Sequence, residues 1–475
     1  MLLDKSIQKL SDLIKRKEIS SVQLVEEAYA RIETLNPRLN VFTTLRKKEE
    51  VLREAQEADT RDPVTPLHGL PYAIKDAYAT QDIRTTASSN VLKDFVPPYD
   101  STVYKKLKKA GAILLGKTNM DAWGHGATTE NTDFGPTKNP WDLTRVAGGS
   151  SGGSAVAVAV RFVAFAMGED TGGSIRNPAA WTNTTGLKVT YGRVSRYGAA
   201  AYASSFDTMG PLGKTVEDCA CVLEHIAGID PYDGSSSPEP VKQYQKILDV
   251  SLQKKVIAIP KELFEKGIDP EIRQMILQTK KVFENLGITI QETSMPLLDY
   301  ALPVYYFIGP SETSSNLARY DGIRYGQNRD HFTPETIRRI MIGTYALSAG
   351  YYDAFYKKAQ RVRTMLIQEY ERVFRACDAI LMPVTPTSPS KIGELMNDPL
   401  QNILADMYTT SQNPVGVPSL AIPCGFTSSK LPIGMQLIGK KFSEDLLFAI
   451  GHQYQVATSW HKTLPPIFTT KKEGV

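Results

Sequence analysis

Cysteine and histidine are scarce in this chain of 475 residues, which has four cysteines and six histidines. A small domain held together by disulfides needs far denser cysteine, so a disulfide scaffold is excluded. Cys219 and Cys221 form a C-x-C pair with no second cysteine pair nearby, which argues against a zinc site. This cysteine usage favours a reducing, cytoplasmic compartment.

The sequence also lacks a long apolar run and a strong excess of either charge. Its most apolar stretch, residues 155–167, is broken by Arg161 and is shorter than the ~18 apolar residues of a membrane-spanning helix. The first 17 residues mix charged side chains into apolar ones, unlike a signal peptide. Lys and Arg number 55 against 51 Asp and Glu, and this scattered net charge of +4 indicates neither a nucleic-acid nor a membrane surface. We expect a soluble protein.

Helical and strand-like patterns alternate along most of the chain. An S-x-x-Q capping box at residues 20–23 predicts the start of a helix. Helices are predicted at residues 7–14, 101–110, 270–286, 353–374 and 444–454, and strands at 70–76, 112–115, 255–260, 379–382, 418–423 and 434–438. This rhythm predicts an α/β fold in which helices cover a large mixed sheet.

Residues 124–213 are dense in glycine, serine and threonine, a composition typical of a flexible linker. The segment also carries Trp141, Phe162, Phe165 and Trp181, which is too much apolar surface to remain solvated. Glycine inside a core-forming region indicates a backbone shaped for close approach to a ligand.

Two familiar motifs in the chain lack the context that their chemistry needs. Residues 111–118 fit the phosphate-loop pattern G-x-x-x-x-G-K-T, but the intervening Ala-Ile-Leu-Leu should itself form a strand. Ser150 and Ser151 each fit G-x-S-x-G, but the turn-like residues 139–145 precede them where a nucleophile elbow needs a strand. We interpret both matches as coincidental.

A third pattern joins Lys75 to two glycine-rich turns at residues 148–154 and 170–176. Successive backbone amides in the sequence Asp-Thr-Gly-Gly-Ser can stabilise an oxyanion, with the hydroxyl of Ser174 beside them. A desolvated, neutral lysine can serve as the base for a serine nucleophile, and a second serine can relay the proton. Composition alone also allows a non-catalytic interpretation, in which the amine of Lys75 reaches solvent and the glycines only form turns.

Residues 148–197 resemble the core motif of the amidase signature family, whose members hydrolyse amides. In this resemblance Lys75 matches the base, Ser150 the bridging serine on a cis peptide, and Ser174 the acyl nucleophile. The residues that match the oxyanion-hole backbone are Thr171, Gly172 and Gly173. The resemblance implies a single amidase-signature domain over residues 1–475, with N-terminal helices at 1–60, a catalytic core at 65–230 and the rest of the sheet and the substrate pocket at 231–475.

Within that family the chain is most similar to the glutamine-hydrolysing subunits of tRNA-dependent amidotransferases. The stretches that carry this likeness are residues 116–121, 129–137, 190–198, 311–326 and 343–352. The likeness implies that glutamine is hydrolysed and that the ammonia converts Glu-tRNA(Gln) or Asp-tRNA(Asn) to Gln-tRNA(Gln) or Asn-tRNA(Asn). It implies a heterotrimer with B and C subunits, in which a partner uses ATP and Mg²⁺ and binds the tRNA. It implies no cofactor and no metal in this chain.

The same resemblance suggests a pocket for glutamine. Arg339 matches the residue that holds the α-carboxylate, Asp406 the acid near the α-ammonium, and Tyr305 a tyrosine that lines the site. A guanidinium fork suits a carboxylate. Without the resemblance, these residues would be interpreted as a surface ion pair and a core aromatic.

The chain departs from the family pattern at several positions. Ala122 and His125 replace Glu and Met, residues 181–185 differ, Val189 replaces Pro, and the loop after Tyr325 is short. We expect these changes to alter pocket shape or partner contacts and to leave the triad intact. Two other functions stay open: a stand-alone amidase acting on another small amide, and a non-enzymatic scaffold.

Overall fold

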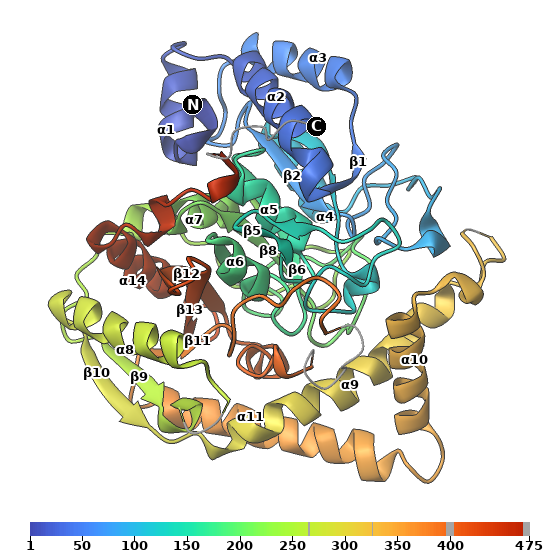
Figure 1. Cartoon of the computed structure of the whole chain (residues 1–475), viewed down its shortest axis with the longest axis vertical. Coiled ribbons are helices and arrows are strands. Elements are labelled where there is room, and N and C mark those ends of the chain that lie inside the picture. Colours follow the sequence, from blue (N-terminus) through green and yellow to red (C-terminus); the bar gives the residue numbers. More distant parts are fainter. Residues whose placement is uncertain (265–266, 325, 396–402, 469–475) are drawn as a thin grey trace.

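The fold is built on one eleven-stranded sheet, seen here in a computed structural model that describes residues 1–264, 267–324, 326–395 and 403–468. The strand order is β1-β3-β2-β6-β8-β7-β12-β13-β11-β9-β10. The helices α1–α3 gather at one end of the molecule and α9–α11 at the other, with α5 and α6 over the central strands (Figure 1).

The strands and helices have the following bounds. The strands are β1 (Phe42–Leu45), β2 (Pro71–Lys75), β3 (Ile113–Thr118), β4 (Lys138–Asn139), β5 (Asp142–Val146), β6 (Phe165–Asp170), β7 (Thr185–Lys188), β8 (Thr208–Gly213), β9 (Val256–Pro260), β10 (Thr289–Thr293), β11 (Ala379–Pro383), β12 (Ser419–Phe426) and β13 (Pro432–Gly439). The helices are α1 (Ile7–Lys15), α2 (Ser21–Leu39), α3 (Lys48–Asp59), α4 (Thr102–Lys109), α5 (Gly152–Ala159), α6 (Arg176–Thr182), α7 (Val216–Ile226), α8 (Pro270–Asn285), α9 (Ala301–Asn316), α10 (Pro334–Leu347), α11 (Lys358–Phe374), α13 (Gln412–Val415) and α14 (Glu444–Ala457).

The sheet is mixed, which confirms the predicted fold class. β2 pairs in parallel with β3 and β6, and β9 pairs in parallel with β10 and β11. The central pairs β6/β8, β7/β8, β7/β12 and β12/β13 are antiparallel. Every residue of β2, β6, β8, β11 and β13 is buried, because helices and loops cover both faces of the sheet.

Local sequence signals account for many of these elements. Ser20 and Gln23 form the predicted capping box at the start of α2. The predicted strand at residues 112–115 is confirmed but is longer, since β3 runs through Gly116, Lys117 and Thr118. The phosphate-loop match is therefore part of a buried strand. The predicted helix at 353–374 begins with a π-helical turn, Asp353–Lys357, before α11.

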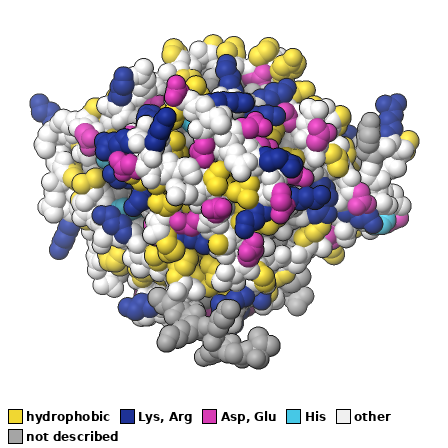
Figure 2. Space-filling view, turned by 90° about the horizontal axis from the view of Figure 1, so that it is seen from above, with side chains coloured by type: hydrophobic (Ala, Val, Ile, Leu, Met, Phe, Trp, Pro, Cys, Tyr) yellow, Lys and Arg dark blue, Asp and Glu magenta, His cyan; other side chains and the backbone are white. Residues whose placement is uncertain are grey.

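The surface carries both signs of charge. Lys and Arg side chains alternate with Asp and Glu over the face seen in Figure 2. Within the residues that the structure describes, no helix is long and apolar enough to cross a membrane. No cluster of three or more His, Cys, Asp or Glu side chains in the same residues could hold a metal ion.

Candidate active site

Lys75 ends β2 with its side chain fully buried. Its Nζ donates a hydrogen bond of 2.7 Å to Oγ of Ser150. The same Nζ lies 3.4 Å from the carbonyl oxygen and 3.3 Å from the carboxylate of Glu169, on the neighbouring strand β6. The amine is thus enclosed and directed at the second serine, which excludes the alternative of a lysine that reaches solvent.

Ser150 lies in the tight turn before α5, and the Gly149–Ser150 peptide bond is cis. The turn needs glycine at position 149, since a Cβ there would lie 2.1 Å from Oδ2 of Asp121. The Asp121 amide donates to the carbonyl oxygen of Ser150 at 3.2 Å, and the Ser151 amide donates to that of Ser174 at 3.0 Å. These bonds bring the two glycine-rich turns side by side.

Asp170, the last residue of β6, holds the turn that carries Ser174. Its carboxylate accepts from the amides of Gly173 (2.9 Å) and Ile175 (3.1 Å) and from Nε and Nη2 of the buried Arg176. Burial opposes ionisation of Asp170, but the charge and hydrogen bonds of Arg176, the charge of Lys188 and the Ile175 amide together hold the pKa of Asp170 at about 2. The turn is thus fixed by an ion pair that stays charged at neutral pH.

The turn Thr171–Gly173 is closely packed. A Cβ at Gly172 would lie 2.5 Å from the ring of Tyr305, and at Gly173, where φ is +137°, 2.3 Å from Oγ1 of Thr409. The Gly173 amide already donates to Asp170. Among the described residues, the amides of Thr171, Gly172 and Ser174 make no hydrogen bond, so these are the donors that remain for an oxyanion.

A cavity of about 380 Å³ opens beside the Ser150 turn. Its wall includes Asp121, His125, Tyr306, Arg338 and Arg339. The Asp121 carboxylate accepts from two backbone amides, and burial raises its pKa to about 6. The cavity thus presents both acidic and basic side chains, and Asp121 in its wall contacts the Ser150 turn, although Lys75, Ser150 and Ser174 are not among the residues that line it.

Arg339 and Asp406, predicted to bind the two charges of an amino acid, both contact Tyr306. The guanidinium carbon of Arg339 lies 5.4 Å from the centre of the Tyr306 ring, and the Tyr306 hydroxyl donates to Oδ2 of Asp406 at 3.5 Å. Burial raises the pKa of Asp406 to about 7, although the charge of Arg339 opposes this shift. Tyr306 therefore contacts a buried cation through its ring and a buried acid through its hydroxyl.

Tyr305 occupies a different position. Its ring packs against Gly172 and stacks on Phe206 at 6.0 Å between ring centres. It therefore supports the Ser174 turn, while its neighbour Tyr306 lines the cavity. The sequence analysis missed Tyr306, and it also missed Glu335, which forms an ion pair with Arg339 at 2.7 Å. The spacing of four residues between Glu335 and Arg339 on a helix was the available signal for that pair.

His125, one of the positions at which the chain departs from the family pattern, lies in the cavity wall. Its Nδ1 lies 3.1 Å from Oγ1 of Thr336, and its ring meets the ring of Tyr202 edge-on at 4.7 Å. Burial, with the charges of Arg339 and Arg338, lowers its pKa well below the usual range. His125 is therefore a neutral part of the wall. Trp181, another departure, instead donates from Nε1 to Oγ1 of Thr385 at 3.1 Å and is not among the residues that line this cavity.

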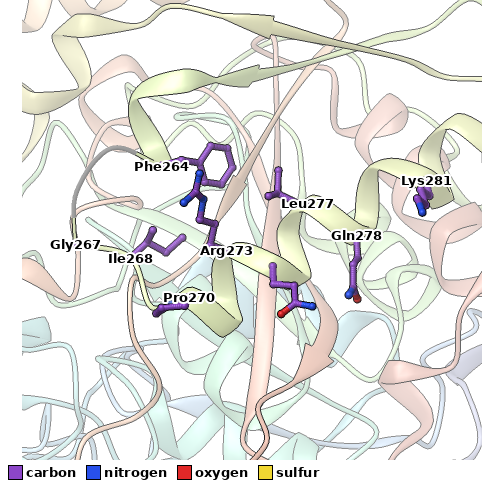
Figure 3. A pocket seen from close by; sticks show the side chains of 9 residues that line it. Phe264, Gly267, Ile268, Pro270, Arg273, Leu277, Gln278 and Lys281 are labelled. Carbon is purple, nitrogen blue, oxygen red and sulfur yellow. The ribbon is translucent and has the colours of Figure 1, made fainter.

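A larger hollow of about 650 Å³ lies along α8, between Phe264, Arg273 and Lys281 (Figure 3). The residues that line it do not include Lys75, Ser150 or Ser174, and none of them lines the cavity that contains Arg339. Its lining includes two cationic side chains, Arg273 and Lys281, and no serine or cysteine.

Comparison with known proteins gives the family. Residues 23–448 match the Amidase family. The chain is 46% identical to the glutamyl-tRNA(Gln) amidotransferase A subunit of Sulfurihydrogenibium sp. (strain YO3AOP1), over 98% of this chain and 100% of that protein. The crystal structure of the corresponding A subunit from Thermotoga maritima superposes with a TM-score of 0.85 at 36% identity, covering 98% of each chain. The native peptide amidase from Stenotrophomonas maltophilia gives a TM-score of 0.81 at 27% identity, covering 98% of this chain and 99% of that one. The chain belongs to the amidase family.

Proposed function

We propose that this chain is the glutamine-hydrolysing A subunit of a glutamyl-tRNA(Gln) amidotransferase. The observation that carries the substrate assignment is that Arg339 and Asp406 both contact Tyr306, and that Arg339 and Tyr306 line the cavity whose wall contacts the Ser150 turn through Asp121. A free amino acid presents a carboxylate and an ammonium on one carbon, and a buried cation and acid so placed can recognise both.

In the proposed mechanism, Ser174 is the nucleophile and neutral Lys75 the base. Lys75 takes the proton of the Ser150 hydroxyl as Ser150 takes that of Ser174, and Oγ of Ser174 attacks the side-chain amide carbon of glutamine. The amides of Thr171, Gly172 and Ser174 stabilise the tetrahedral oxyanion. The proton returns through Ser150 to the leaving nitrogen, so that ammonia departs. Water, activated by the same route, then hydrolyses the γ-glutamyl ester to glutamate.

The wider assembly is part of the same proposal. The relatives are named as A subunits, which supports a multi-subunit enzyme. We assign the ammonia to a partner subunit that activates Glu-tRNA(Gln) or Asp-tRNA(Asn) with ATP and Mg²⁺ and binds the tRNA, with B and C subunits completing a heterotrimer. Because tRNA charging serves protein synthesis, we place the complex in the cytoplasm.

Substrates that lack one charge test the pocket. Glutaramate is glutamine without its α-amino group, and 4-aminobutanamide is glutamine without its α-carboxylate. Each should have a kcat/KM about 10- to 100-fold below that of glutamine, since each loses one charge-assisted interaction. Ammonia release from all three gives the comparison. Equal kcat/KM values would favour the stand-alone amidase and remove Arg339 and Asp406 from the substrate site.

The selectivity for the α-amino group should depend on pH through Asp406. The raised pKa of about 7 means that this carboxyl is protonated below pH 7 and then cannot attract the ammonium. The ratio of kcat/KM for glutamine to that for glutaramate should therefore fall about tenfold between about pH 8 and about pH 6. Using a ratio cancels any pH dependence of the chemical steps that both substrates share. Asp406→Asn should give a low and constant ratio. A constant ratio in the wild-type enzyme would exclude Asp406 from ammonium binding.

A further inference from the structure

Glu335 holds the inner edge of the Arg339 guanidinium. Its Oε1 accepts from Nε of Arg339 at 2.7 Å, and its two oxygens accept from Nε (2.6 Å) and Nη2 (2.7 Å) of Arg338. The Arg339 side chain is 5% exposed and that of Glu335 is 22% exposed. One carboxylate thus fixes two consecutive arginines at the first turns of α10.

Among the described residues, the other contacts of Arg339 leave one edge of its guanidinium open. Nη1 donates to the hydroxyl of Tyr202, and the rings of Tyr202 and Tyr306 lie 5.6 and 5.4 Å from the guanidinium carbon. In the part of the chain that the structure describes, Nη2 makes no hydrogen bond. Arg339 lines the cavity, so the edge formed by Nη1 and Nη2 is the one available to a ligand.

Glu335 is placed to remain charged in this role. It follows Pro334 in the first turn of α10, where the helix dipole favours a negative charge. Although burial opposes ionisation, the charges of Arg339 and Arg338 hold the pKa of Glu335 below its usual range. At neutral pH the carboxylate therefore keeps its hold on Nε of Arg339.

We propose that Glu335 is a positioning residue for substrate recognition, which orients Arg339 so that its outer edge receives the α-carboxylate of the amino-acid substrate. This proposal rests on the proposed function, because it requires a substrate with an α-carboxylate. Glu335 acts through Arg339 and takes no part in the chemistry at Ser174.

Comparison of two substrates isolates this role. In Glu335→Ala, kcat/KM for glutamine should fall about tenfold, mainly through a higher KM. The value for 4-aminobutanamide, which has no α-carboxylate to place, should change less than about twofold. Glu335→Gln, which keeps one oxygen acceptor, should restore part of the loss. Turnover of 4-aminobutanamide also shows that each variant is folded.

Asp353→Ala is the matched control. Asp353 also pairs with a cation four residues later, Lys357, but that pair is exposed and does not line the cavity. Asp353→Ala should leave kcat/KM unchanged for both substrates. If kcat/KM falls equally for the two substrates in Glu335→Ala, Glu335 has only a structural role. If kcat/KM for glutamine does not fall, Arg339 keeps its orientation without Glu335. A wild-type enzyme with no preference for glutamine over 4-aminobutanamide would instead overturn the proposed function, and this proposal with it.

Discussion

Replacing Ser174 with alanine is expected to lower kcat for glutamine by about 10⁴- to 10⁶-fold, because the proposed acyl-enzyme cannot form without its hydroxyl. The fold should survive, since the Ser174 side chain makes no hydrogen bond to the described residues and its carbonyl contact with Ser151 belongs to the backbone. Ammonia release and thermal unfolding of the purified variant check both statements.

Ser151→Ala is the control for this substitution. Ser151 also fits the G-x-S-x-G pattern, lies in the neighbouring turn, and donates to the carbonyl oxygen of Glu169 at 3.1 Å. It has no place in the proposed proton route, so its loss should cost about 1 kcal/mol of stability and little turnover. Inactivity of Ser151→Ala together with activity of Ser174→Ala would reverse the assignment of the nucleophile.

The second large effect is expected at Lys75. Lys75→Ala removes the group that receives the proton through Ser150, and kcat should fall by about 10²- to 10⁴-fold. Lys75→Arg should not restore activity, because a guanidinium stays protonated and cannot act as a base. Loss of turnover in both variants, with the fold retained, would support Lys75 as the base.

Removal of Lys75 also leaves Glu169 without the amine that lies 3.3 Å from its carboxylate. Burial raises the pKa of Glu169 and the contact with Lys75 opposes that shift, so Lys75→Ala should raise the pKa of Glu169 further. Thermal unfolding therefore has to accompany the kinetics. Full activity in Lys75→Arg would remove Lys75 from the mechanism.

The outer parts of the fold follow from local sequence patterns. The alternation of apolar residues predicts α8, β9, β11 and α14 within a few residues, because each buries one face or a short apolar run. The helix α9 gave no such signal, since its apolar residues are spread around its axis and Pro310 lies within it. Tertiary packing against α10 and α11 accounts for that helix.

The site also contains residues that the sequence predicts and residues that it does not. Lys75, Ser150 and Ser174 could be proposed from the glycine-rich turns and the family resemblance, because the turn chemistry is local in the sequence. The contacts that support them could not be predicted, because they join residues far apart in the sequence. Tyr306 and Asp406 are 100 residues apart, and Arg339 and Tyr202 are 137 apart. Such contacts depend on how the helices pack on the sheet. The division of the chain at residues 60 and 230 stays a prediction.

The most direct measurement is ammonia release by the purified chain from glutamine, asparagine and a panel of aryl and aliphatic amides, first alone and then with the B and C subunits. The account predicts that glutamine is the preferred substrate, that the partner subunits stimulate its hydrolysis, and that Ser174→Ala abolishes it under both conditions. Partner-independent turnover of simple amides with glutamine ignored would contradict it and make this chain a stand-alone amidase.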